Sequence, residues 1–302
     1  MTAPASACAQ PHATEGRRRE LFRESPLAVC RRVVLGTAWA LRPKRVRNLL
    51  PLARLYLADL FAGKRELPES GSFAASDFVG IVHDLSVPTL QAAYARGLYP
   101  YGHFGWLKWA SPAKRSVLFL EDVHISARLR SIMRQGRFTV TFDRDFEAVI
   151  TACAAPRRGR WPLTWITPQI MRAYARFYDE GQVHSFEVWN QERVLVGGGY
   201  GVVTGRTFVT ESLFFRESNA SKIGFAVLAW HLAKWGFLLC DNKWATPAMA
   251  SLGFRTLPRD RFLELLAENA ANPREGAWNA EAGPEIVALW HPKKDRVSPR
   301  AA

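Results

Sequence analysis

Four short segments combine aromatic and polar side chains in a way that could hold and activate a small substrate. They span residues 109–115, 164–168, 208–216 and 240–243. Glu211 and Asp241 supply carboxylates near predicted strand ends, and Trp109 and Trp165 supply aromatic walls. Each residue alone also has a structural explanation. A tryptophan more often packs in a core than binds a ligand, Glu211 can pair with Arg216, and Asp241 can cap a turn.

The usual motifs of metal, nucleotide and covalent chemistry are absent from the sequence. The glycine run at residues 197–205 lacks the G-x-G-x-x-G spacing and continues into strand-like sequence, so it indicates close backbone approach. The four cysteines (Cys8, Cys30, Cys153 and Cys240) and the seven histidines have no ligand spacing. There is no G-x-S-x-G elbow. We therefore expect chemistry that uses no metal, no cofactor and no covalent intermediate.

The chain is strongly basic, and the basic residues are concentrated near its N-terminus. It has 41 Lys and Arg against 27 Asp and Glu, a net charge of +14, and residues 1–70 hold 13 basic and 6 acidic residues. This surplus favours an anionic partner. The basic segment either packs on the main domain or presents a basic face to RNA or lipid. No apolar run is long enough to span a membrane, and no secretory signal is recognisable, so we expect a cytoplasmic monomer.

The hydrophobic periodicity, together with the capping residues, glycines and prolines that end helices and strands, predicts a mixed α/β fold with antiparallel hairpins. The predicted helices cover residues 86–96, 124–135, 145–153, 167–180, 220–235, 246–252 and 260–270, and the strands cover 116–121, 138–142, 183–189, 194–203, 206–212 and 237–241. The order is not a regular βαβ series. Residues 49–60 predict an amphipathic helix. We expect a disordered basic tail (1–24), a basic helical extension (25–70), a small domain (71–135), a main domain (136–270) and a C-terminal tail (271–302).

Ten motifs in unbroken order make the sequence similar to one enzyme family. They begin with DLSVPTLQAAYARGLYP at 84–100 and continue through residues 109–118, 124–130, 164–167, 184–189, 198–202, 211–214, 219–222, 250–253 and 257–259. Over residues 78–265 the chain resembles the leucyl/phenylalanyl-tRNA–protein transferases. The resemblance implies an acetyltransferase-like (GNAT) mixed sheet with flanking helices, preceded by a smaller N-terminal domain. It also implies transfer of leucine or phenylalanine from aminoacyl-tRNA to the N-terminal Arg or Lys of a protein, without cofactor.

The resemblance also assigns roles to individual residues. Asp241, Lys243 and Glu211 occupy catalytic positions, with Glu211 as a polar anchor and Asp241 orienting the side chain two residues later. Substrate-binding positions are Trp109, which stacks near the terminal adenosine, and Ser111, Trp165, Phe208, Leu213 and Ser221. Expected tRNA contacts are Arg115, Lys222, Arg42, Lys44 and Arg45, since phosphates are read by charge.

The sequence departs from the family at one catalytic position. The family has glutamine in a D-x-Q run, whereas Lys243 stands there in this chain. An amide donates and accepts hydrogen bonds, but an ammonium group only donates, so Lys243 is expected to steady an oxyanion, held by Asp241. Val82 and His83 also replace Gly-Gly, and Trp109-Ala110 replaces a double tryptophan. The alternatives are a transferase of the same fold with another amine acceptor, or a non-catalytic binder of aminoacyl-tRNA.

Overall fold

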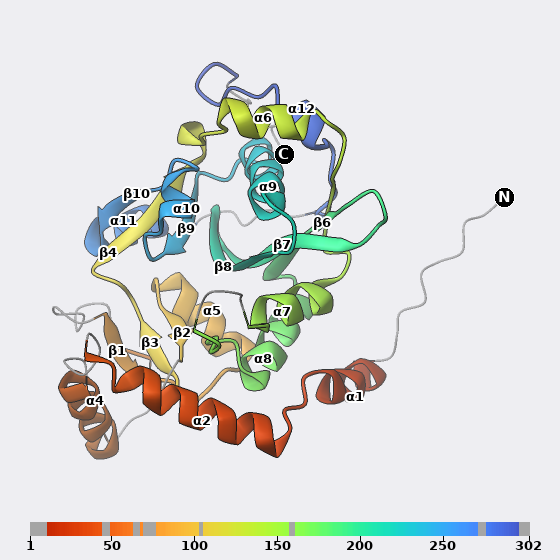
Figure 1. Ribbon diagram of the computed structural model, residues 1–302. Helices are drawn as coiled ribbons and strands as arrows, with labels where there is room; N and C mark the ends of the chain where they lie inside the picture. The colour runs from red at the N-terminus through yellow and green to blue at the C-terminus, as the bar shows by residue number, and fades with distance from the viewer. Residues whose placement is uncertain are drawn as a thin grey trace.

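Strands form two separate sheets in the computed structural model, which describes residues 11–43, 49–62, 67–68, 77–102, 105–156, 161–270 and 276–295 (Figure 1). The small sheet has the order β1-β3-β2, with β1 (Phe78–Ile81), β2 (Tyr99–Tyr101) and β3 (Lys108–Ala110). The large sheet has the order β10-β4-β9-β8-β7-β6-β5. Its strands are β4 (Lys114–Phe119), β5 (Thr139–Phe142), β6 (Val183–Trp189), β7 (Leu195–Thr204), β8 (Thr207–Phe215), β9 (Leu239–Lys243) and β10 (Arg255–Pro258).

One parallel pair interrupts the otherwise antiparallel large sheet. The chain leaves β8, crosses over through α9 (Ala220–Lys234) and returns as β9, so β8 and β9 run parallel. Their pairing starts at Thr207 with Leu239 and stops at Val209 with Asp241. Strand β8 continues beyond this point to Phe215, whereas β9 ends at Lys243. A notch therefore opens between two neighbouring strands inside the sheet.

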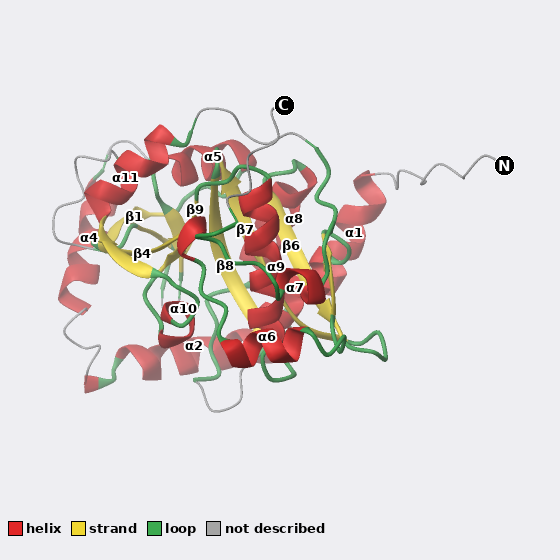
Figure 2. Cartoon of the chain, turned by 90° about the horizontal axis from the view of Figure 1, so that it is seen from above, coloured by secondary structure: helices red, strands yellow, loops and turns green. Residues whose placement is uncertain are grey.

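Helices cover both faces of the large sheet (Figures 1 and 2). Helix α9 packs on β6 and β7, and α6 (Ala127–Met133) and α12 (Pro284–Val287) lie beside it. The other face carries α5 (Val87–Ala95), α7 (Phe146–Ala154) and α8 (Pro168–Asp179). The short α10 (Pro247–Ala250) and α11 (Arg259–Glu268) lie near β9 and β10. Burial of both faces explains why β7 is apolar or glycine through most of its length.

The glycine run in β7 provides close approach, as its spacing predicts. A Cβ atom at Gly197 would lie 2.7 Å from Ala220 Cβ, at the start of α9, and one at Gly201 would lie 2.5 Å from Phe208 Cζ. Real Cβ atoms do not tolerate such distances, so a side chain at either position would push α9 or β8 outward. The run is therefore part of the packing of the sheet.

Most predicted elements are present, and the mixed α/β class is confirmed. Strand β6 has its predicted bounds, and α8 is capped by Thr167, whose hydroxyl accepts from the backbone N of Ile170. The short strands β1, β2, β3 and β10 were not predicted, because three or four residues show too little periodicity.

Two expectations about the ends of the chain are wrong. Residues 1–24 were expected to lack structure, but Pro11–Leu21 form α1, which is anchored by ion pairs from Arg18 to Glu147 and Asp179. Residues 271–302 were expected to be a tail, but Trp278 and Trp290 are buried in the core beside α9. Anchoring contacts of this kind involve residues far away in the sequence, so local composition does not reveal them.

The sheets also divide the chain at a different place from the expected one. Strand β4 was assigned to a small domain ending at residue 135, but it lies inside the large sheet between β10 and β9. The small sheet ends with β3 at residue 110. Two further helices, α2 (Pro26–Ala40) and α4 (Leu49–Phe61), lie along the edge of the molecule next to the small sheet (Figure 1).

Candidate active site

Two β-bulges face one another at the notch between β8 and β9. In the pairing of β7 with β8, Tyr200 lies opposite Ser212 and Gly201 opposite Thr210, so Glu211 is the extra residue. In the pairing of β4 with β9, Ser116 lies opposite Lys243 and Val117 opposite Asp241. A bulge bends its strand and changes the direction of a side chain. Lys243 also has φ of +63°, which ends β9 there.

These bends bring Glu211 and Lys243 together in a buried ion pair. Lys243 Nζ lies 2.8 Å from Glu211 Oε1, and both side chains are almost fully buried. The Tyr94 hydroxyl donates to Glu211 Oε1 at 2.8 Å, and the Tyr174 hydroxyl donates to Glu211 Oε2 at 3.4 Å. The two tyrosine hydroxyls also contact each other. Glu211 is therefore held from three sides, by groups from α5, α8 and β9.

A second buried pair lies behind the first. Arg115 donates from Nε to Asp241 Oδ1 at 2.9 Å and from Nη2 to Asp241 Oδ2 at 2.6 Å. Its Nη1 donates to the carbonyl of Gly97 at 2.9 Å, and Asp241 Oδ1 also accepts from the backbone N of Lys243 at 2.7 Å. Asp241 thus holds the backbone of Lys243 in its left-handed conformation. The bidentate geometry fixes this support rigidly.

The four charges form two compensated pairs with different surroundings. Burial lowers the pKa of Lys243, and the nearby Glu211 carboxylate acts in the opposite direction. Burial also raises the pKa of Tyr94 and Tyr174, so both hydroxyls stay protonated and act as donors. The site therefore holds an ammonium group whose proton is less tightly bound than in free lysine, beside a carboxylate that accepts hydrogen bonds.

The Glu211–Lys243 pair forms part of the wall of a cavity of about 840 Å³. The Lys243 ammonium lies 4.9 Å from the centre of the Tyr99 ring and 5.9 Å from that of Trp165. Most of the remaining wall is apolar, with Leu163, Leu213, Phe215, Trp244, Met249 and Leu252 among its residues. An apolar cavity with one charged pair can hold an apolar side chain and polarise a group next to it. No cluster suited to a metal ion occurs among the described residues.

The structure brings six of the expected site residues to this cavity and places others elsewhere. Glu211, Lys243, Trp165, Leu213, Ser221 and Lys222 line it. Trp109, Ser111 and Phe208 are buried away from its lining, and Phe208 packs against Gly201 and Trp278. Arg42 is exposed and lies 4.0 Å above the ring of Trp161, another lining residue. Lys44 and Arg45 lie outside the described residues.

Three expectations about charged residues need correction. Lys243 was expected to be held by Asp241 through its side chain, but its ammonium contacts Glu211, and Asp241 accepts a hydrogen bond from the backbone N–H of Lys243 instead. Arg115 was expected to contact tRNA, but it is 1% exposed and its donors point to Asp241 and Gly97. The bulge in β9 explains the first error, because simple alternation of side chains fails there. The suggested pairing of Glu211 with Arg216 is also absent: Arg216 donates to the carbonyl of Leu195.

Sequence reasoning missed the tyrosines that hold Glu211. Tyr94 is the tyrosine of the segment AYARGLYP, and Tyr174 lies on the buried face of α8. Their apolar neighbours made both look like ordinary core residues. The available signal was the tyrosine hydroxyl itself, which needs a partner when it is buried.

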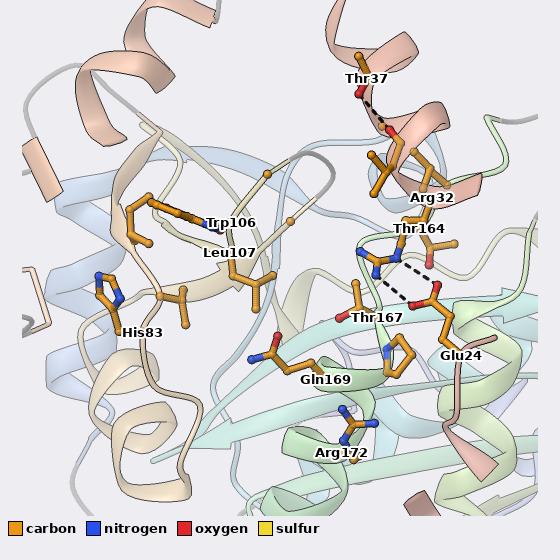
Figure 3. A pocket seen from close by; sticks show the side chains of 18 of the residues that line it. Glu24, Arg32, Thr37, His83, Trp106, Leu107, Thr164, Thr167, Gln169 and Arg172 are labelled. Carbon is orange, nitrogen blue, oxygen red and sulfur yellow. Dashed lines mark hydrogen bonds and ion pairs between the residues drawn. The ribbon is translucent and has the colours of Figure 1, made fainter. Parts of the chain in front are cut away.

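A second cavity, of about 960 Å³, separates the N-terminal helices from the main body (Figure 3). Its wall includes Arg19, Arg23, Arg32 and Arg172, and also Thr164 and Thr167. Arg32 forms a two-pronged contact with Glu24 at 3.1 and 3.0 Å. Leu163 and Thr164 line both cavities, so the two cavities adjoin at the segment before α8.

Comparison with known sequences points to one family. The family model described as leucyl/phenylalanyl-tRNA protein transferase matches residues 117–267. The transferase of that name from Pseudomonas syringae pv. syringae is 45% identical over 198 residues, which cover 65% of this chain and 86% of the relative. The one from Azotobacter vinelandii is 46% identical and covered to 87%. Among solved structures, L-PGS from Bacillus licheniformis gives a TM-score of 0.29 at 12% identity, over 48% of this chain and 45% of that one.

Proposed function

The chain belongs to the leucyl/phenylalanyl-tRNA–protein transferase family, and from that premise we propose how its Glu211–Lys243 pair performs the reaction. As a member it is an aminoacyltransferase, which moves leucine or phenylalanine from aminoacyl-tRNA to the N-terminal Arg or Lys of a protein. The single observation that carries the site assignment is the 2.8 Å ion pair at the wall of the apolar cavity.

The cavity accepts the side chain of the donor amino acid. Trp165, Leu213 and Met249 supply apolar contacts for leucine or phenylalanine, and the ester carbonyl then lies next to the charged pair. The ester is already activated, so the protein has to hold the ester and the amine together and stabilise charge. Placement of this kind accounts for a large part of the barrier reduction.

The two charged groups divide the chemistry between them. The acceptor amine attacks the ester carbon, and the carbonyl oxygen becomes negatively charged. The Lys243 ammonium has three N–H donors and forms an ion pair with Glu211. It donates a hydrogen bond to that oxygen. Glu211 accepts the proton that the amine loses, and this proton leaves with the ribose oxygen when the C–O bond breaks. Tyr94 and Tyr174 keep Glu211 in place throughout.

The notch between β8 and β9 also supports a proposal about the fold family. We infer an acetyltransferase-like arrangement because β8 and β9 are parallel, are joined by α9 and separate after Val209. This separation lets an acyl group and an amine meet inside a sheet. The small sheet of β1, β2 and β3 corresponds to the smaller N-terminal domain.

Contacts to tRNA are assigned to basic residues at the edge of the cavity. Lys222 lines the cavity, and Arg42 stacks on Trp161 at its rim, so both can meet phosphates near the 3′ end. Arg115 becomes a positioning residue for Asp241.

The direct test is transfer of labelled leucine from leucyl-tRNA to a reporter protein that begins with Arg. We expect labelled reporter, and no label on the same reporter with an acetylated N-terminus, because the attacking group is the free amine. Discharge of the tRNA without labelling would indicate another acceptor. Binding of the tRNA without discharge would indicate a non-catalytic binder.

The pH dependence of transfer tests the role of Lys243. Its ammonium is present below its pKa and lost above it, and burial places that pKa below the value of free lysine, 10.5. Single-turnover transfer is therefore expected to fall as the pH rises into the alkaline range. The Lys243→Gln variant, which has no proton to lose, should not show this fall. Spontaneous ester hydrolysis, measured without protein, is the control. A rise with pH that is seen in the wild type and lost in Lys243→Gln would instead assign Lys243 as the base.

The salt dependence of tRNA binding tests the assignment of Arg42 and Lys222. Each Arg42→Ala or Lys222→Ala change should weaken binding and reduce the slope of log K against log salt by about 1. Arg137→Ala is the matched control, since Arg137 is exposed beyond α6 and lines neither cavity. An unchanged slope in Arg42→Ala or Lys222→Ala would place the phosphate contacts elsewhere.

A further inference from the structure

Large apolar side chains on the surface are concentrated on the N-terminal helices. Among the described residues, ten of the sixteen exposed large hydrophobic side chains lie between Leu21 and Phe61. This segment precedes residues 117–267, which the family model matches. An exposed apolar patch of this extent marks a surface for a partner or a membrane.

The outward face of α2 is an apolar stripe. Leu27, Val34 and Leu41 are spaced by seven residues, so they lie on one side of the helix, and they are 80%, 67% and 60% exposed. The opposite face holds Gly36 and Ala40, which are buried. The side of α2 that faces the protein also carries Arg32, at the second cavity (Figure 3). The stripe thus lies on the side of α2 opposite to Gly36, Ala40 and Arg32.

Helix α4 repeats this arrangement. Leu50, Leu57 and Phe61 have spacings of seven and four residues and are 61%, 54% and 86% exposed. The inward side holds Tyr56, whose ring packs edge-on against Trp106, and Asp59, which lies 2.8 Å from His83 Nε2. No residue of α4 is buried. Leu50, Leu57 and Phe61 therefore form an apolar stripe on the outward side of α4.

The charges that accompany the two stripes are positive. Arg31 lies on the exposed side of α2, and Arg54 lies on that of α4. Helix α2 contains no acidic residue, and the single acid of α4 is Asp59, which faces His83. An exposed apolar stripe that carries arginine and lacks free acid is typical of helices that lie in the surface of an anionic membrane.

We propose that α2 and α4 dock the protein on the surface of a membrane that contains anionic lipids. Both helices lie along one edge of the molecule, outside the large sheet (Figure 1). The leucine, valine and phenylalanine side chains enter the boundary of headgroups and acyl chains, and the arginines meet lipid phosphates. This attachment is peripheral, because no described helix is long and apolar enough to cross a bilayer.

Other occupants fit the outward faces less well. RNA would contact arginines and aromatic rings, but the stripes consist mainly of aliphatic side chains. A two-fold dimer through this surface would bring together two patches that carry arginine and no free acid, so the contact would lack charge complementarity. An anionic lipid surface offers acyl chains to the apolar stripes and phosphate groups to Arg31 and Arg54.

Sedimentation with vesicles tests the proposal on the full chain, without tRNA. The wild type should bind vesicles of phosphatidylglycerol and phosphatidylcholine and bind pure phosphatidylcholine vesicles much more weakly. A variant with Leu27→Ser, Val34→Ser, Leu50→Ser and Leu57→Ser should bind about tenfold more weakly or worse. The matched control carries Val194→Ser, Leu238→Ser, Ile286→Ser and Leu289→Ser, which change four exposed apolar side chains elsewhere, and should bind like the wild type.

Two further measurements separate the alternatives. Arg31→Ala with Arg54→Ala should weaken binding to anionic vesicles and leave binding to neutral ones unchanged. Transfer of leucine in solution should be unchanged in the serine variant, which shows that it is folded. The proposal is overturned if the wild type binds neither kind of vesicle. It is also overturned if the serine variant binds anionic vesicles as tightly as the control variant does. It is also overturned if the serine changes act through the oligomeric state or through tRNA affinity.

Discussion

The Glu211→Gln variant is expected to lose about 10²- to 10⁴-fold in kcat/KM for transfer from leucyl-tRNA. The substitution keeps the size of the side chain but removes the group that accepts the proton of the attacking amine. It also removes the negative charge that stabilises the buried ammonium of Lys243, which lies 2.8 Å from Glu211. We therefore expect most of the loss in kcat, since an amide at this position still allows the cavity to bind the donor.

Glu187→Gln is the control for this experiment. Glu187 is another buried carboxylate of the same sheet, which accepts from Ser185 and Thr141 and lies outside the cavity. Its replacement can lower stability, but kcat measured on folded protein should stay close to wild type. Equal losses in kcat for the two variants would show that Glu211 acts only through stability.

The Arg115→Met variant is expected to be destabilised by about 3–5 kcal/mol. Arg115 is 1% exposed and supplies two donors to Asp241, which is fully buried. Removing the guanidinium leaves a carboxylate without its main partner inside the protein, and this costs far more than a surface pair would. Urea unfolding, with linear extrapolation to water, measures the effect.

Arg255→Met is the matched control for stability. Arg255 lies on the neighbouring strand β10, is largely exposed and has its nearest carboxylate, Asp122, at 3.8 Å. Surface pairs of this kind contribute about 1 kcal/mol or less. A loss for Arg115→Met no larger than that of the control would show that the buried pair does not hold β4 and β9 together.

The order of helices and strands was predictable because it depends on local signals. Thr167 with Pro168, Ser86 and the glycines that end helices mark their boundaries within a few residues. The antiparallel hairpin of β7 and β8 was read from Thr204-Gly205. These features need no information about distant parts of the chain.

The internal geometry of the site was not predictable in the same way. Asp241, Lys243 and Glu211 were all expected at the site, with Lys243 held by Asp241, but the actual partner of Lys243 depends on two bulges that shift strand register. Tyr94 and Tyr174 come from α5 and α8, 80 residues apart in the sequence. Trp109 belongs to a family motif and Phe208 was expected to bind the substrate, yet both side chains are packed in the core. Such placements depend on tertiary packing.

The surfaces of the N-terminal helices were also not predictable from the sequence. Composition alone allowed RNA or lipid as the anionic partner of this segment. Only the observed faces of α2 and α4 show that the outward stripes are aliphatic. Arg32, which lines the second cavity, is on the inner side of α2 (Figure 3). The same basic segment thus presents two chemically different surfaces.

A crystal structure with a non-hydrolysable analogue, in which an amide joins phenylalanine to adenosine, tests the central claim most directly. We predict that the phenyl ring occupies the cavity beside Trp165 and Leu213, and that the carbonyl oxygen accepts a hydrogen bond from Lys243 Nζ. The open side of that carbonyl should face Glu211. A bound analogue whose carbonyl points away from both groups, with its side chain outside the cavity, would contradict the assignment of Glu211 and Lys243 as the catalytic pair.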